Sequence, residues 1–161
     1  MKIQRWCALA LLPLLMLVAY AGAEDKKKED KGNVCMQANP VNLCTAANTC
    51  GADCSVDVKR TSYSSSATPN IAGVKGNEVF CVKSGTTVTW MSSAKNIGFL
   101  VSFGDSSPFD SANPIMGGTD KAVPMVASKA GCYKYDVSAT AANGVYGKSK
   151  AAQAFMIVVA K

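Results

Sequence analysis

Six cysteines beyond residue 34 constrain the fold of this chain more than any other feature of its sequence. Four of them lie in a short stretch that is otherwise poor in core residues: Cys35, Cys44, Cys50 and Cys54. Such a segment buries too little apolar area to fold alone, so we expect disulfide bridges among these four. Zinc is the competing interpretation, because four thiolates can bind it, but paired C-x2-C knuckles are missing. Cys81 and Cys132 are then left to pair with each other.

The amino terminus has the pattern of a cleavable signal peptide over residues 1–23. Lys2 and Arg5 precede an apolar run, and small residues at positions 21–23 stand before Glu24. The run is shorter than the roughly 20 apolar residues of a membrane span, and Pro13 interrupts it. We therefore expect export to a periplasmic or extracellular location, with no membrane span after signal cleavage. The even number of remaining cysteines agrees with an oxidising compartment.

The charge of the chain is moderately basic, since 17 Lys and Arg against 11 Asp and Glu give a formal net charge of +6. Most lysines are scattered, and residues 24–33 form a leader in which acidic and basic residues balance. Blocks of charge without apolar residues do not fold, so this leader is predicted to be disordered. A nucleic-acid partner is not expected, because Arg-rich clusters with interleaved aromatic residues are missing.

Residues 56–161 show short strands separated by turn residues. The predicted strands are rich in β-branched or aromatic residues and cover residues 56–58, 79–82, 86–91, 99–103, 121–127, 133–138 and 154–159. Residues 83–85 have the pattern of a hairpin turn, and residues 62–70 that of a Ser-rich loop. Together these features predict one all-β domain, a sandwich or barrel, behind a Cys-rich segment over residues 34–55.

Four short stretches carry a family resemblance, and together they cover roughly residues 74–159. V-K-S-G-T-T-V-T-W is similar to the β-hairpin of cupredoxins, and F-L-V-S-F to the strand that begins with the first copper histidine of that family. A-G-C-Y-K-Y-D-V-S-A-T-A-A-N-G-V-Y-G resembles in spacing the region with the other three ligands, and F-M-I-V-V resembles the closing strand. The resemblance implies a cupredoxin-like Greek-key β-sandwich, here preceded by a short disulfide-stapled segment.

The copper ligands of that family are all replaced in this chain. Carried over by spacing, they fall on Phe99 for the first histidine, Val137 for the cysteine, Thr140 for the second histidine and Val145 for the methionine. A type 1 site needs two imidazoles, a thiolate and a weak thioether, and the chain contains no histidine. The resemblance therefore implies the fold of the family without its copper, and no cofactor is expected.

The residues near these positions have two interpretations. They would form a docking patch at the end where copper would lie, made of Phe99, Pro108, Phe109, Met116, Val137 and Val145. Alternatively, the same side chains fill the vacated space as core, which avoids the cost of an empty cavity. Core filling is the favoured interpretation, since burial is the usual state of large apolar residues.

Catalysis is not expected from this sequence. Without histidine, Ser-His-Asp and Cys-His mechanisms are excluded. The candidate acid–base residues are four carboxylates in no recognisable motif: Asp105, Asp110, Asp120 and Asp136. A Ser128–Lys129 dyad is disfavoured, because adjacent residues of a strand point to opposite faces.

These features favour an exported, non-catalytic binding or structural module, with a protein or cell-envelope partner that the residues do not identify. The alternative is a periplasmic redox or copper-handling protein with non-standard Met and Cys ligands. Thioethers bind Cu(I), and five methionines lie beyond the signal peptide: Met36, Met91, Met116, Met125 and Met156. They lack M-x-M and M-x-x-M spacing, and methionine more often fills gaps in cores.

Overall fold

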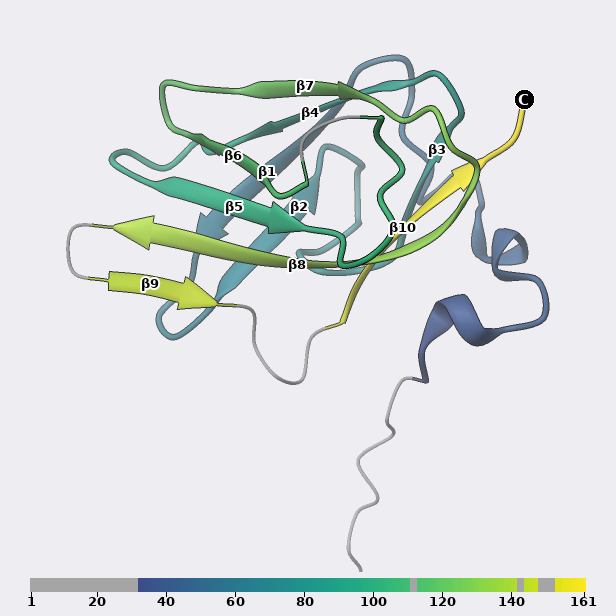
Figure 1. Cartoon of the computed structure of the whole chain (residues 1–161), viewed down its shortest axis with the longest axis horizontal. Helices are drawn as coiled ribbons and strands as arrows, with labels where there is room; N and C mark the ends of the chain where they lie inside the picture. The colour runs from purple at the N-terminus through teal and green to yellow at the C-terminus, as the bar shows by residue number, and fades with distance from the viewer. Residues whose placement is uncertain (1–31, 111–112, 142–143, 148–152) are drawn as a thin grey trace, which may run out of the picture. The chain divides into compact units, whose positions relative to one another are not determined.

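β-strands dominate the part of the chain that the computed structural model describes, namely residues 32–110, 113–141, 144–147 and 153–161 (Figure 1). The predicted signal peptide and nearly all of the predicted charged leader lie outside this part. Two short 3-10 helices, η1 (Val34–Met36) and η2 (Pro40–Leu43), precede the strands. The described residues include no helix long and apolar enough to cross a membrane. The expectation of an all-β chain is confirmed.

The first sheet has four strands in the order β2-β1-β4-β7. They are β1 (Cys54–Arg60), β2 (Ser65–Pro69), β4 (Thr87–Met91) and β7 (Val123–Val126). β1 and β2 form an antiparallel hairpin, whereas β1 lies parallel to β4. Buried and more exposed side chains alternate along β1, β2 and β4, so one face of this sheet points into the core and the other to solvent.

The second sheet runs in the order β3-β10-β8-β5-β6, and β9 also pairs with β8. Its strands are β3 (Phe80–Lys83), β5 (Gly98–Ser102), β6 (Ile115–Gly118), β8 (Gly131–Ala141), β9 (Gly144–Gly147) and β10 (Ala154–Val159). The first half of β8 pairs with β10, and the second half pairs with β5 and β9. β10 is buried on both faces over its first five residues. A further layer must therefore cover the outer face of the sheet at β10.

The core between the two sheets is rich in aromatic side chains. Trp90 on β4 and Tyr135 on β8 are its largest fully buried members, and their ring centroids lie 5.5 Å apart in an edge-to-face arrangement. Phe103 packs against both, 6.0 Å from Trp90 and 5.4 Å from Tyr135. Aromatic pairs of this kind contribute about 0.5–1.5 kcal/mol beyond the burial of their area, so this cluster helps to fix how the sheets pack.

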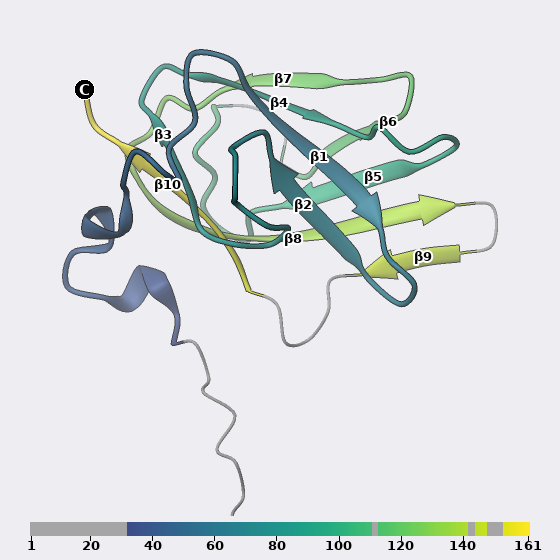
Figure 2. The same cartoon turned by 180° about the vertical axis from the view of Figure 1, so that it is seen from behind.

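The Cys-rich segment forms the further layer, on the outer face of the second sheet (Figure 1, Figure 2). Helix η1 contacts β8, and η2 contacts β10. On this face Ile157 lies in register between Cys81 of β3 and Cys132 of β8. Cys81, Phe155 and Ile157 are buried without belonging to the core between the sheets. The segment therefore supplies the apolar cover that β10 requires.

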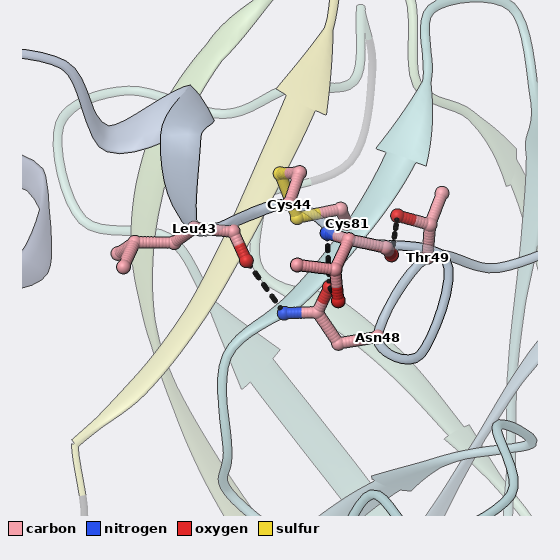
Figure 3. Close-up of a disulfide and its surroundings, with 6 residues drawn as sticks. Leu43, Cys44, Asn48, Thr49 and Cys81 are labelled. Atoms are coloured by element: carbon pink, nitrogen blue, oxygen red, sulfur yellow. Dashed lines mark hydrogen bonds between the residues drawn. A yellow bond between two sulfur atoms is a disulfide. The ribbon is translucent and has the colours of Figure 1, made fainter.

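Two disulfides link the Cys-rich segment to the sheet on either side of Ile157. Cys35 bonds to Cys132 and Cys44 bonds to Cys81 (Figure 3), with Cα atoms 5.3 Å and 5.7 Å apart. Both Cα separations lie in the usual range for a disulfide. The segment is thus held to β8 and to β3, the two neighbours of β10.

The third disulfide, Cys50–Cys54, is the one bridge within the Cys-rich stretch. The expectation of three disulfides from six cysteines is confirmed, but the predicted pairing is wrong. Four cysteines of the segment do not pair only among themselves, and Cys81 does not bond to Cys132. The reason is that β10 lies between Cys81 and Cys132. Strands two positions apart are separated by about 9.6 Å, which exceeds the roughly 7 Å limit between bridged Cα atoms.

Backbone hydrogen bonds also hold the Cys-rich segment against β3 (Figure 3). The Cys81 N–H donates to the carbonyl oxygen of Asn48, and the Cys50 N–H donates to the carbonyl oxygen of Cys81, both at 2.8 Å. The Asn48 side chain donates to the Leu43 carbonyl at 3.0 Å and accepts from the Thr45 N–H at 2.8 Å. The position of the segment is therefore determined by hydrogen bonds as well as by disulfides.

Two local predictions are wrong because the strands have partners that are distant in sequence. The predicted hairpin over residues 79–91 does not form, since β3 pairs with β10 while β4 pairs with β1 and β7, so the intervening turn connects the two sheets. The predicted Ser-rich loop over residues 62–70 contains β2, whose inner residues are buried. Asn77 caps the outer edge of β2, accepting from the Ala67 N–H at 3.0 Å and donating to the Ser65 carbonyl at 3.1 Å.

Candidate functional site

The four positions that the cupredoxin resemblance assigns to copper ligands do not converge in space. Phe99 on β5 and Val137 on β8 are buried in the core. Thr140 lies three residues beyond Val137, and Val145 is its register partner on β9. Because side chains alternate along a strand, Thr140 and Val145 face the outer side of the sheet, opposite to Val137. Four side chains divided between two faces of one sheet cannot surround a single ion.

The β8–β9 hairpin carries Thr140 and Val145, and a serine from the other sheet holds it. The hydroxyl of the buried Ser65 accepts from the Ala139 N–H at 2.8 Å and donates to the Tyr146 carbonyl. Ala139 and Tyr146 are register partners, so this hydroxyl bridges the two strands. The Arg60 guanidinium lies 4.1 Å from the centroid of the Tyr146 ring, a cation–π contact. β8 continues past Val137 by pairing with β5 and β9, and Ser65 adds a contact from the other sheet, so Thr140 faces outward.

The predicted docking patch of six apolar residues does not form as one surface. Four of its members are buried: Phe99, Pro108, Phe109 and Val137. These four residues follow the core-filling interpretation. The ring centroid of Phe109, for example, lies 5.4 Å from that of Phe103. Met116 and Val145 are instead 63% and 71% exposed, on the outer face of the second sheet. The two groups lie apart because Met116 belongs to β6 and Val145 to β9, two strands that local sequence patterns did not predict.

Two buried aromatic residues carry polar groups that lack a hydrogen-bond partner among the described residues: the Trp90 Nε1 and the Tyr135 hydroxyl. Burial raises the pKa of Tyr135 far above its usual value. Oxidation of a tyrosine releases its phenolic proton, and none of the residues that the structure describes is placed to accept it. The geometry therefore gives Tyr135 a packing role and offers no support for redox chemistry at this residue.

The sulfur-containing residues are spread over several parts of the fold, and Met125 on β7 is half-buried against the core. The six cysteines beyond residue 34 are all oxidised, so none offers a thiolate. Met156 is buried in the core, Met91 lies on the outer side of the first sheet and Met116 on the outer side of the second. Met36 is 83% exposed on η1. Within the described ranges, no group of three or more Cys, Asp or Glu residues is arranged to hold a metal ion.

The four carboxylates considered as acid–base candidates are dispersed and exposed: Asp105, Asp110, Asp120 and Asp136. Ser128 and Lys129 make no dyad, because the Ser128 hydroxyl donates to the Pro108 carbonyl at 3.4 Å while the Lys129 ammonium lies 3.5 Å from Asp110. These contacts tie a surface loop and the end of β7 together. They do not assemble a nucleophile with a base.

Asp57 on β1 is a carboxylate that the sequence analysis did not single out. Burial alone would raise its pKa, but hydrogen bonds from the Ser93 hydroxyl and backbone N–H, with the nearby Lys59 ammonium at 3.0 Å, outweigh burial and lower the pKa. Asp57 thereby holds the chain that leaves β4. Its role in this geometry is structural.

Part of the outer face of the second sheet is exposed, beyond the area that the Cys-rich segment covers. Two register rows cross β6, β5, β8 and β9 on this side. One row comprises Gly118, Gly98, Thr140 and Val145, and the other comprises Met116, Leu100, Ser138 and Gly147. We call these eight residues the exposed face. It carries no charged side chain, and its exposed Met116 and Val145 are the features that most favour a binding surface.

A cleft of about 480 Å³ opens beside the exposed face, lined by the start of β5, by β6 and by the turn that follows. Glycines shape this region of the sheet. A Cβ atom at Gly117 would lie 2.4 Å from the Phe99 ring, and one at Gly98 would lie 2.4 Å from the Thr140 hydroxyl. Both positions therefore require a residue without a side chain. The Phe99 ring and the Thr140 hydroxyl thus occupy the space beside these glycines, and the cleft itself is lined by Met116 together with the charged Asp120 and Lys121.

Comparisons with known proteins do not identify a family. No protein-family model matches this chain, and a search of curated proteins finds none with significant sequence similarity. The cupredoxin resemblance therefore stays a prediction that depends on four short motifs. The function has to be inferred from the geometry of the described residues.

Proposed function

We propose that this protein is an exported, non-catalytic binding module on a copper-free, cupredoxin-like β-sandwich. The exposed face and the adjacent cleft are its binding surface. The observation that carries this proposal is the exposure of Met116 and Val145, 63% and 71%, on an uncharged sheet face. Exposed apolar patches on a folded domain mark interaction sites.

The strand arrangement supports the sandwich part of the proposal. Two sheets share one apolar core, and successive strands such as β3 and β4 belong to different sheets. Connections that cross between sheets are typical of Greek-key β-sandwiches. Export is supported by the three disulfides, which are characteristic of oxidising compartments.

A Cu(II) titration of the mature protein tests the copper-free part of the proposal. We expect no intense thiolate-to-copper absorption at about 600 nm, because the residues at the four ligand positions carry no imidazole, thiolate or thioether and face opposite sides of a sheet. A blue, tightly bound copper would contradict the proposal. Colourless Cu(I) binding that is lost on exchange of methionines for leucine would favour the copper-handling alternative.

Site-specific photo-cross-linking tests the binding surface in cells that export the protein. A photoreactive residue replaces Met116 or Val145, and the matched control replaces Val126, which is 52% exposed on the outer side of the first sheet. A cross-linked product of one defined mass from positions 116 and 145, and none from position 126, is the expected result. Equal products from all three positions, or none from any, would contradict the assignment of the surface.

A further inference from the structure

We propose that the partner of the exposed face is a second copy of this chain, an inference that rests on the binding function proposed above. The distribution of side-chain size over the face is self-complementary. Along the first row, two glycines on β6 and β5 are followed by the larger Thr140 and Val145 on β8 and β9. Along the second row, the larger Met116 and Leu100 come first, followed by a serine and a glycine. Large side chains therefore occupy one diagonal of the face and small residues the other.

Consider a two-fold axis that lies between two copies and runs parallel to the strands. It places the large side chains of one copy over the small residues of the second copy. This axis places β6 of one copy over β9 of the second, and β5 over β8. Val145 then lies over Gly118 of the second copy, and Met116 lies over Gly147 of the second copy. The same contacts are repeated by symmetry, as in any isologous dimer. Each exposed apolar side chain of the face therefore lies opposite a residue without a side chain.

The cleft gives this arrangement a specific contact. Gly98, Gly118 and Met116 are among its lining residues, so the Val145 side chain of the second copy enters its edge. The exposed face bears no charge, although the chain as a whole carries a formal charge of +6. Asp136 lies one row beyond the exposed face on the same side of β8, and Asp120 and Lys121 line the cleft, so these charged side chains lie around the contact rather than within it, where burial of like charges would be costly. The preferred alignment of packed sheets, with strand directions within about 30° of each other, is compatible with this axis.

The size of the exposed face sets the strength of the contact. Four strands at about 4.8 Å and two rows at about 7 Å give a face of roughly 19 by 14 Å. Stable complexes bury about 800 Å² on each partner, so this contact is small and the dimer is weak. We expect reversible association that develops between about 10 μM and about 1 mM protein.

Sedimentation equilibrium of the mature, oxidised chain tests the proposal over that concentration range. The wild type should show a weight-average mass that rises from one chain towards two. Met116→Lys and Val145→Lys should each lower the association constant at least about tenfold, because each buries a charge against a glycine surface. The controls Val126→Lys and Met36→Lys, at exposed apolar positions outside the exposed face, should leave it unchanged. Thermal melting checks that each variant keeps the wild-type fold.

A charge exchange tests the orientation of the axis. In the proposed dimer, Met116 of one copy lies close to Val145 of the other, whereas within one chain they are on outer strands of the face. Met116→Lys combined with Val145→Glu in the same chain should therefore associate at least about fivefold more strongly than Met116→Lys alone, through two symmetric ion pairs. No recovery in the combined variant would overturn the proposed axis and the complementarity argument with it.

A wild type that stays monomeric to about 1 mM would overturn the dimer proposal. So would an equal loss of association in Val126→Lys. Neither result would overturn the binding function, because photo-cross-linking from positions 116 and 145 tests that function separately. A cross-linked product of twice the chain mass supports the dimer, and a product of any other single mass contradicts it while leaving the binding surface in place.

Discussion

Removal of the Cys35–Cys132 disulfide tests whether the Cys-rich segment acts as a covalently held third layer. The bond joins residues 97 apart in sequence, and the Cys44–Cys81 bond shortens the loop that it closes to about 60 residues. The chain-entropy relation gives about 4 kcal/mol for a loop of this length. Loss of the bond also frees η1 from β8, beside the buried Ile157.

The double variant Cys35→Ala/Cys132→Ala should therefore melt about 12–20 °C below the wild type, at about 3–5 °C per kcal/mol for a domain of this size. Its far-ultraviolet circular dichroism in the cold should remain that of a β protein, since the core between the sheets is not changed. The matched control is Cys50→Ala/Cys54→Ala, whose bond closes a loop with a sequence separation of only 4. The same relation gives about 2 kcal/mol for that bond, so the control should lose about half as much.

Two results would refute this reasoning. The first is a melting temperature of the double variant within about 3 °C of the wild type, which corresponds to less than about 1 kcal/mol. The second is a larger loss in the control than in the Cys35→Ala/Cys132→Ala variant. Peptide mapping of the unreduced protein provides a direct check, because a peptide pair containing Cys81 bonded to Cys132 would exclude the observed connectivity.

Two further predictions concern single side chains. Ser65→Ala removes the bridging hydroxyl, so it should lower the free energy of unfolding, measured in urea, by about 1–3 kcal/mol and speed hydrogen exchange at the Ala139 amide. The control Ser66→Ala, at the neighbouring position, should change the free energy of unfolding by less than about 0.5 kcal/mol. The folded-state pKa of Asp57 is lowered from 3.8, so its contribution to stability is present above that value and is lost as the pH falls through the lower folded pKa. Ser93→Ala should weaken this acid dependence in urea unfolding series at several pH values, and an unchanged dependence would contradict the assignment.

Local sequence patterns located most of the strands. Residues 154–159 coincide with β10, and the predictions for β5, β7 and β8 overlap the observed strands, because β-branched and aromatic residues cluster there between turn residues. β2 was missed because its serines and threonine carry no apolar pattern, yet Ser65 and Ala67 are buried by contacts with other parts of the fold. A local sequence pattern reflects only the residue types of the segment, whereas the burial of β2 depends on the other parts of the fold that pack against it.

The candidate binding surface was reached only in part from the sequence. Met116 and Val145 were among the predicted patch residues, but they were grouped with side chains such as Phe109 that the fold buries. Successive side chains along a strand point to opposite faces of the sheet. A shift of one residue therefore moves a side chain from the inner face to the outer face. The glycines of the exposed face give no hydrophobic signal at all. Their importance appears only when the strands are aligned.

Residue types alone determined that this chain would be all-β, that its six cysteines beyond residue 34 would be oxidised, and that it lacks the imidazoles of a type 1 copper site. Tertiary structure decided which cysteine bonds to which, which half of the second sheet the Cys-rich segment covers, and which way Thr140 and Val145 face. Strand order places β10 between Cys81 and Cys132, and β8 continues beyond Val137 because it pairs there with β5 and β9. These outcomes depend on pairing between segments as far as 97 residues apart, which short-range patterns do not encode.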